Sequence, residues 1–157
     1  MEQYLNVLKD SLIKKERILL NLLDKSEEQA DVVKQNEVDW DYFTKLVDEK
    51  GELVEELLKL DEGFDFLYQR IKENLENNKE NYKDMIKEIQ ELIKSVTQKS
   101  ADLQVLEIRN KRLIEGTFAN TRNEIKKSKL SQSAAIQYYN KMNRINTIDP
   151  QLMDKNC

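Results

Sequence analysis

Residues 43–71 read FTKLVDEKGELVEELLKLDEGFDFLYQRI, and an apolar side chain returns in this stretch every three or four positions. That spacing places the apolar side chains in one narrow stripe along an α-helix, as in the seam of a coiled coil. The same spacing continues through most of the chain, at Leu5, Leu8, Leu12, Leu19, Leu23, Phe43, Leu46, Leu53, Leu57, Leu60, Phe64, Leu67, Ile71, Tyr82, Met85, Ile89, Leu92, Val96, Leu103, Leu106 and Leu113. The sequence therefore predicts an all-α fold, either a long antiparallel helical hairpin or a three-helix coiled-coil bundle.

Two breaks in the apolar spacing divide this predicted bundle into helices at about residues 2–35, 40–75 and 81–128. In the first break, Asp39 is a plausible N-cap, because its carboxylate can accept the free backbone N–H groups of the next helix. Trp40 follows it and is expected to cover the end of the bundle. The second break, over residues 73–81, is rich in asparagine and charge. We expect a loop there, with a solvated helical bridge as the alternative.

The third predicted helix is longer than the first, at roughly 65–70 Å against about 50 Å for a rise of 1.5 Å per residue. Beyond Leu106 its stripe also becomes mostly polar, with Asn110, Leu113, Thr117, Asn120 or Thr121, and Glu124 at successive positions. One polar residue in a seam commonly fixes its register, but several in succession indicate that the stripe is no longer buried. We therefore expect the C-terminal part of this helix to overhang the bundle.

Residues 129–157 form the second predicted region, a tail that follows the bundle of residues 1–128. The tail carries large apolar side chains without a steady helical period, at Tyr138, Tyr139, Met142, Ile145, Ile148, Leu152 and Met153. Pro150 excludes a helix through that position. Tyrosine and methionine are enriched at the centres of protein interfaces, which favours a partner-binding tail. A disordered terminus and a short fourth helix folded back over the bundle end remain open as alternatives.

Charge divides the chain in a similar way. Residues 1–108 hold 16 Lys/Arg and 26 Asp/Glu, a balance of −10, whereas residues 109–144 hold 9 Lys/Arg and 2 Asp/Glu, a balance of +7. A basic segment can bind nucleic acid. Here the basic residues alternate with Asn, Ser and Thr on an acidic protein, and no DNA- or RNA-binding motif is present. We expect a solvated helix end or a surface for an acidic protein partner, and no nucleic-acid partner.

The composition argues against catalysis and against a metal or cofactor site. The chain has no His and only 3 Gly, and its one cysteine is the terminal Cys157. It therefore lacks the commonest general base, the commonest zinc ligand and the residues of a phosphate-binding loop. Paired carboxylates such as Glu88 and Glu91 are best explained as a solvated helix face with i,i+4 ion pairs. We expect no enzyme activity, no catalytic residues, no metal and no cofactor.

The hydropathy of the chain and its first residues do not indicate a membrane protein. No apolar run approaches the ~20 residues of a membrane span. The first four residues, MEQY, lack the positive charge that precedes the apolar core of a signal peptide. We therefore expect a soluble, cytoplasmic protein without a membrane partner.

Several stretches together are similar to one known family. They are the leucine pairs of residues 5–23, the break at 36–39, FTKLVDEKGELVEELLKLD at 43–61, LEIRNKRLI at 106–114, YYNKM at 138–142 and IDPQLMDK at 148–155. These stretches resemble the FlgN family of flagellar export chaperones, and they span most of the chain. The helical stretches are weakly specific, since any coiled coil has similar spacing, and the tail is the more specific part.

The resemblance implies a cytoplasmic chaperone for type III flagellar secretion. Its clients would be the hook-associated proteins of the hook–filament junction, kept unpolymerised and delivered to the flagellar export apparatus. In this family the C-terminal region binds the client, which here corresponds to about residues 113–153. The predicted client-binding residues are Leu113, Tyr138, Tyr139, Met142, Ile145, Ile148, Leu152 and Met153.

Two other functions remain open from the sequence. One is the related helical chaperone of the filament-cap protein, and the other is a structural coiled-coil scaffold that self-associates. A scaffold should form a stable dimer or larger assembly through its seam. A chaperone should form a discrete soluble complex with its client, and a homodimer of the free chain is compatible with that function.

Overall fold

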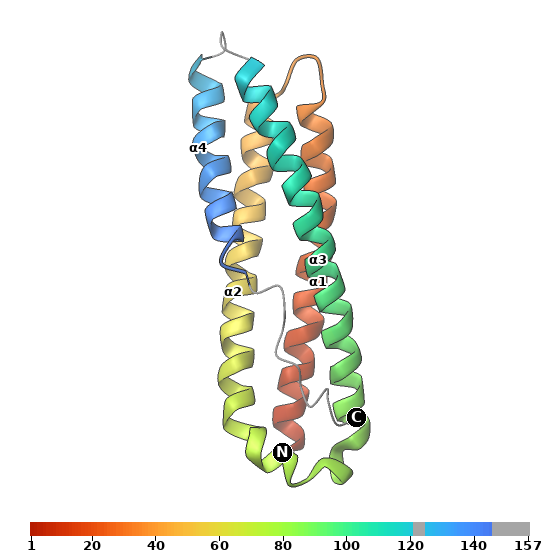
Figure 1. Ribbon diagram of the computed structural model, residues 1–157. Helices are drawn as coiled ribbons and strands as arrows, with labels where there is room; N and C mark the ends of the chain where they lie inside the picture. Colours follow the sequence, from red (N-terminus) through yellow and green to blue (C-terminus); the bar gives the residue numbers. More distant parts are fainter. Residues whose placement is uncertain (121–124, 146–157) are drawn as a thin grey trace.

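The computed structural model describes residues 1–120 and 125–145, with the side chains of residue 120 and residues 125–128 left aside. The chain runs up, down, up and down along one long axis (Figure 1). Its elements are α1 (Glu2–Val33), α2 (Trp40–Glu76), the short 3-10 helix η1 (Lys79–Tyr82), α3 (Lys83–Asn120) and α4 (Ile125–Met142). Strands are absent from the described residues. The prediction of an all-α helical bundle is confirmed.

The two predicted breaks lie where the chain reverses direction. After α1, Asp39 caps α2, because its carboxylate oxygen Oδ1 accepts a hydrogen bond from the backbone N–H of Tyr42 at 3.1 Å. Between α2 and α3, η1 occupies part of the asparagine-rich stretch, and the Asn78 side chain donates to the backbone oxygen of Asn74 at 2.7 Å. Local side-chain hydrogen bonds thus satisfy backbone groups at both ends of α2.

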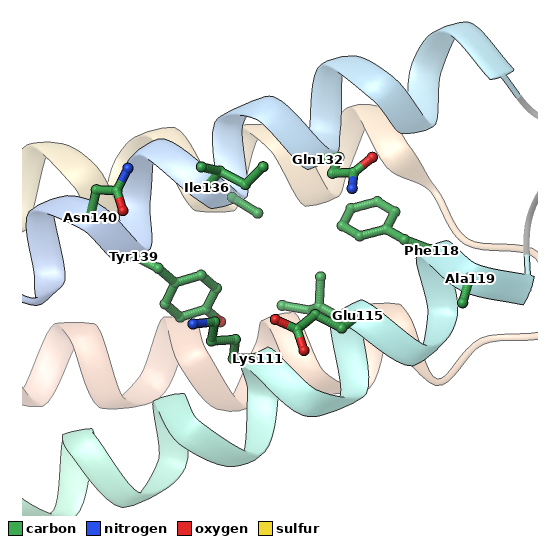
Figure 2. A pocket seen from close by; sticks show the side chains of 10 residues that line it. Lys111, Glu115, Phe118, Ala119, Gln132, Ile136, Tyr139 and Asn140 are labelled. Carbon is green, nitrogen blue, oxygen red and sulfur yellow. The ribbon is translucent and has the colours of Figure 1, made fainter.

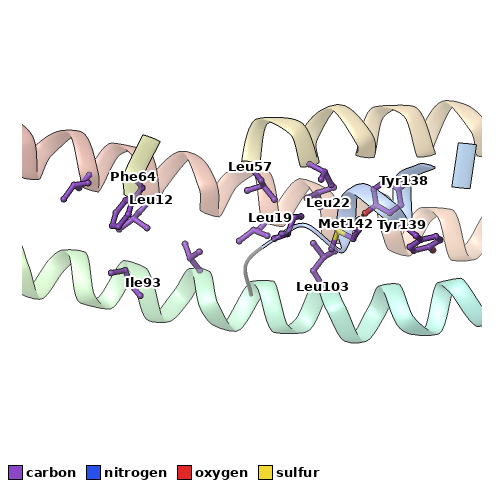
Figure 3. Packing of buried hydrophobic residues seen from close by; sticks show 14 of the residues in the cluster. Leu12, Leu19, Leu22, Leu57, Phe64, Ile93, Leu103, Tyr138, Tyr139 and Met142 are labelled. Carbon is purple, nitrogen blue, oxygen red and sulfur yellow. Dashed lines mark hydrogen bonds between the residues drawn. The ribbon is translucent and has the colours of Figure 1, made fainter. Parts of the chain in front are cut away.

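The buried side chains of each long helix follow a heptad repeat. In α1 they are Leu5, Leu8, Leu12, Lys15, Leu19, Leu22, Ser26, Gln29 and Val33. In α3 the corresponding positions include Ile86, Ile89, Ile93, Val96, Ser100, Leu103, Glu107, Asn110 and Ile114. Figure 3 shows Leu19 and Leu22 of α1, Leu57 of α2 and Leu103 of α3 meeting in the interior. The core is therefore a continuous coiled-coil seam in which some positions are polar.

The helices have unequal neighbours around the bundle. α1 packs most extensively against α3, which runs in the same direction, and also against the antiparallel α2. α4 packs against α2 and runs parallel to it (Figure 1). The order around the bundle is consequently α3, α1, α2 and α4.

The predicted overhang of the third helix is wrong. α3 ends at Asn120, and α4 turns back along α2 over the same half of the molecule. The polar seam position Asn110 is 2% exposed, because its side-chain amide donates a hydrogen bond to the backbone oxygen of Ser26 in α1 at 2.7 Å. A polar seam residue therefore remains buried here because it has a partner across the interface.

The predicted boundary at residue 128 also differs from the structure. α4 begins at Ile125, and its heptad positions Ser131, Ala135, Tyr138 and Met142, followed by Ile145, are buried against the rest of the bundle. Up to Ile145, the alternative of a fourth helix that folds back is confirmed, although this helix lies along α2 and does not cover the bundle end. The tail had no apparent period because two of these heptad positions are occupied by serine and alanine.

Candidate partner-binding groove

A buried polar layer joins α1, α2 and α3 in the half of the bundle that contains α4. Lys50 of α2 is fully buried, and its Nζ lies 2.8 Å from Oε1 of Glu107 in α3. The same ammonium group donates to the side-chain oxygen of Gln29 in α1. Burial lowers the pKa of Lys50, and the neighbouring Glu107 carboxylate partly offsets that shift. The cost of removing both charges from water offsets much of their attraction, so the pair adds little net stability, but loss of one partner would leave a buried, unpaired charge.

Two tyrosines of α4 complete the layer. The Tyr138 ring lies over Lys50, with Nζ 4.4 Å from the ring centroid. Tyr138 and Tyr139 pack edge to face, with their ring centroids 5.2 Å apart. Burial, followed by the charge of Glu107, raises the pKa of both hydroxyls, so both remain protonated at neutral pH. α4 therefore covers the charged layer with aromatic rings.

α4 is held on α2 by polar contacts at both of its ends. Near its start, the hydroxyls of Ser131 and Thr44 lie 2.8 Å apart. Near its end, Lys141 Nζ lies 2.8 Å from Oε1 of Glu55. Gly51 lies beneath this second contact, and a Cβ there would be 3.7 Å from Lys141 Nζ. These contacts fix α4 along α2 and leave its other edge facing α3.

An aromatic cluster fixes α3 at the end of the bundle where the α1–α2 connection lies. Phe118 of α3 stacks on Trp40 at a centroid distance of 5.0 Å and meets Phe43 edge to face at 6.1 Å. Trp40 is buried and is the first residue of α2, so its predicted place at the end of the bundle is confirmed. Trp40 and Phe43 belong to α2 and Phe118 belongs to α3. The cluster therefore connects these two helices, which lie diagonally across the bundle, and fixes the distance between them.

Between the fixed α3 and the fixed α4 lies a groove of about 440 Å³ (Figure 2). Buried or half-buried side chains form its floor: Ile114, Phe118, Ala135 and Tyr139. Exposed residues form its rim: Lys111, Glu115 and Ala119 on α3, and Gln132, Ile136 and Asn140 on α4. Lys111 reaches over the Tyr139 ring, with Nζ 5.9 Å from the centroid. The arrangement is suited to binding an apolar surface.

The predicted site residues fall into three groups. Tyr138, Met142 and Ile145 are buried in the bundle, and Tyr138 is only 2% exposed. Tyr139 is largely buried too, but its ring lines the groove. Leu113 is half-buried against the core. Ile148, Leu152 and Met153 lie outside the described residues. The premise that these side chains lack a place in the bundle is therefore wrong for Tyr138, Tyr139, Met142 and Ile145.

The sequence analysis missed most of the groove because it followed only the spacing of apolar residues. A strict heptad count from Leu103 passes through Glu107, Asn110 and Ile114, and the neighbouring Leu106 and Leu113 are only half-buried. The same count through α4 would have identified Ser131, Ala135 and Tyr138 as one face. A heptad count of this kind could have found the buried faces of α3 and α4 from the sequence. It requires the assumption that polar residues at heptad positions are buried and have hydrogen-bond or ion-pair partners.

The described residues carry two further findings. No described helix is long and apolar enough to cross a membrane. Within residues 1–120 and 125–145, no His, Cys, Asp and Glu side chains group closely enough to hold a metal ion.

No family model, curated protein or solved structure matches this chain. The groove and the residues around it are therefore the basis on which a function is assigned.

Proposed function

We propose that this protein is a type III flagellar secretion chaperone that binds hook–filament junction proteins in the cytoplasm. It keeps these clients unpolymerised and delivers them to the export apparatus. The observation that carries the proposal is the groove between α3 and α4, whose apolar floor is accessible from one side. The sequence resemblance supports the same conclusion, because it implies client binding by about residues 113–153, and most of the groove lies in that region.

The inward direction of all four heptad seams favours a chaperone over a self-associating scaffold. Each seam is buried within the bundle of one chain, so it is not available to a second copy. A scaffold remains the second candidate because two exposed apolar residues, Val105 and Ile108, lie close together on α3. The mass of the free protein at several concentrations separates the two functions, since the scaffold requires a stable larger assembly.

Co-expression with individual hook–filament junction proteins tests the proposed function. We expect the chain and one such protein to elute together from a size-exclusion column as a discrete soluble complex. The bound client should also fail to polymerise under conditions in which the free client does. If none of the junction proteins co-elutes, the proposal is wrong, and co-elution with the filament-cap protein alone would assign the chain to the related chaperone.

A further inference from the structure

We propose that the groove between α3 and α4 binds an amphipathic helix of a protein partner, and that the polar flanks of this helix are acidic. This inference rests on the proposed function and specifies the chemistry of the segment that the site recognises. It follows from the shape of the groove and from the charges on the surface around it.

The shape of the groove fits about two turns of a helix. On α3 its lining extends from Lys111 to Ala119, which is about 12 Å at 1.5 Å per residue. The volume of about 440 Å³ is roughly three times that of a ~150 Å³ cavity that holds one benzene-sized group. A helix that presents apolar side chains at i, i+3 or i+4, and i+7 would place about three of them on the floor.

The rim residues support a helix with a polar exterior more than a wholly apolar ligand. Gln132 and Asn140 on α4 and Lys111 and Glu115 on α3 are exposed above an apolar floor, as in the polar rim of a protein interface. Ile136 is 54% exposed at the same rim. A bound helix would cover this isoleucine and still keep its own charged side chains near solvent.

The charges beside the groove select the sign of the partner. One exposed basic side chain, Lys111, lines the groove, and four more lie near its ends or beside it in the chain: Arg109 and Arg112 on α3, Lys129 on α4, and Arg144 just after α4. Among residues 109–145, Glu115 is the one acidic side chain that the structure describes. The first 108 residues have the opposite balance, with 16 basic and 26 acidic residues. A partner segment with acidic flanks is therefore attracted to the surface formed by the C-terminal part of α3 and by α4, and repelled by the acidic first 108 residues.

Two synthetic peptides test the inference with the full-length chain. Both form amphipathic helices of about five turns with the same apolar face, and one carries Glu on its flanks where the other carries Lys. We expect the acidic peptide to bind at least about 10-fold more tightly at low salt, as measured by fluorescence anisotropy. Its affinity should fall as salt rises, because the flanking charges are exposed and screened.

A matched pair of variants on α4 locates the binding site. Ile136 lies at the rim of the groove, whereas Leu130, 71% exposed, does not line it. Ile136→Glu and Leu130→Glu make the same chemical change at exposed positions, so both variants should fold. We expect Ile136→Glu to weaken binding of the acidic peptide by at least about 10-fold, because it places a charge against the apolar floor. Leu130→Glu should retain most of the affinity.

Several results would overturn the inference. They are equal affinity for the two peptides, equal loss in the two variants, and no binding of either peptide. The last result would mean that something else occupies the groove, such as a second copy of the chain or the chain's own terminal residues. A dimer that Ile136→Glu dissolves in sedimentation would assign the groove to self-association. None of these measurements uses a flagellar protein, so failure of the proposed function leaves this test independent.

Discussion

The two edges of α3 differ in how closely they pack. Towards α1, Ser95 donates to Glu16 at 2.6 Å and Lys9 Nζ lies 2.6 Å from Glu88, beside a continuous buried seam. Towards α4, α3 faces the groove, and the opposite wall consists of Gln132, Ala135, Ile136, Tyr139 and Asn140, which leave the space between the two helices unfilled. Two helices close on each other only where both supply side chains that fill the space between them.

The comparison also shows how a four-helix bundle can keep one interface open. α4 does not need to pack on α3, because its hydroxyl and ion-pair contacts fix it on α2. α3 in turn is held by α1 and by the aromatic cluster of Trp40, Phe43 and Phe118. The groove therefore lies between two helices that are each supported elsewhere, so a partner could enter without the loss of core packing.

The largest expected effect on stability comes from the buried polar layer of Lys50, Glu107 and Gln29, which joins α1, α2 and α3. Lys50→Ala leaves Glu107 buried without its ion-pair partner and should lower the free energy of unfolding by about 3–5 kcal/mol. Urea denaturation followed by circular dichroism measures this change. The double variant Lys50→Met, Glu107→Leu removes both charges and should recover most of the loss. If the double variant is as unstable as Lys50→Ala, the cost does not arise from the unpaired carboxylate.

A pair of isoleucine substitutions compares the closed interior with the groove directly. Ile89 of α3 is fully buried in the seam, so Ile89→Ala should lower the free energy of unfolding by about 2–5 kcal/mol. Ile136 is exposed at the rim of the groove, and Ile136→Ala should change the free energy of unfolding by less than about 0.5 kcal/mol. The same denaturation experiment measures both. Similar losses at the two positions would show that the groove is closed in solution.

A glycine on α3 allows the groove wall to be stabilised without altering its lining. Gly116 lies within the helix, and a Cβ at this position would have no atom within 4 Å. Gly116→Ala should raise the free energy of unfolding by about 0.5–1 kcal/mol, because alanine is the better helix former. Gly63→Ala in α2, which is equally unobstructed, is the control for a site far from the groove. Peptide binding should be unchanged in both variants, and a loss in Gly116→Ala would mean that this wall must bend.

The smallest expected effect concerns the contact that fixes α4 on α2. The hydrogen bond from Lys141, assisted by its charge, lowers the pKa of Glu55 in the folded protein. Its contribution is therefore complete above the ordinary glutamate pKa of about 4.3 and is lost as the pH falls through the lower folded value. Melting temperatures between pH 7 and pH 3 test this sign. The native chain should be slightly more stable than Glu55→Gln at pH 7, with the difference vanishing in acid. A constant difference would contradict the assignment.

The positions of the first two helix breaks could be read from the sequence, whereas the break between α3 and α4 could not. The break before Asp39 and the asparagine-rich stretch near Asn78 lie where the structure places them, because capping and local hydrogen bonds depend on nearby residues. The heptad register of the buried seams was harder to predict from the sequence. Nothing in the sequence marks Lys50 and Glu107 as buried, and Asn110 was expected to lie exposed in the stripe, because the partners of all three are on other helices.

The place of α4 shows the same limit for the candidate site. The sequence analysis assigned Tyr138 and Tyr139 to a partner-binding tail, but the Tyr138 ring packs over Lys50, which lies 88 positions before it in the chain. The groove residues Gln132, Ile136 and Asn140 show no apolar period of their own. They form a site because α3 and α4 are both held apart by other helices, which local sequence does not encode.

The sequence by itself therefore determined that this protein is built of long helices, where the first two breaks between them lie, and that residues 109–144 are basic. These properties follow from side-chain spacing, capping and charge, which act over a few residues. The tertiary structure alone decided that α4 returns along α2, that polar seam residues are buried, and that a groove remains beside α3. These features depend on contacts between residues far apart in the chain, where a buried charge or amide is tolerated only if a partner from another helix reaches it.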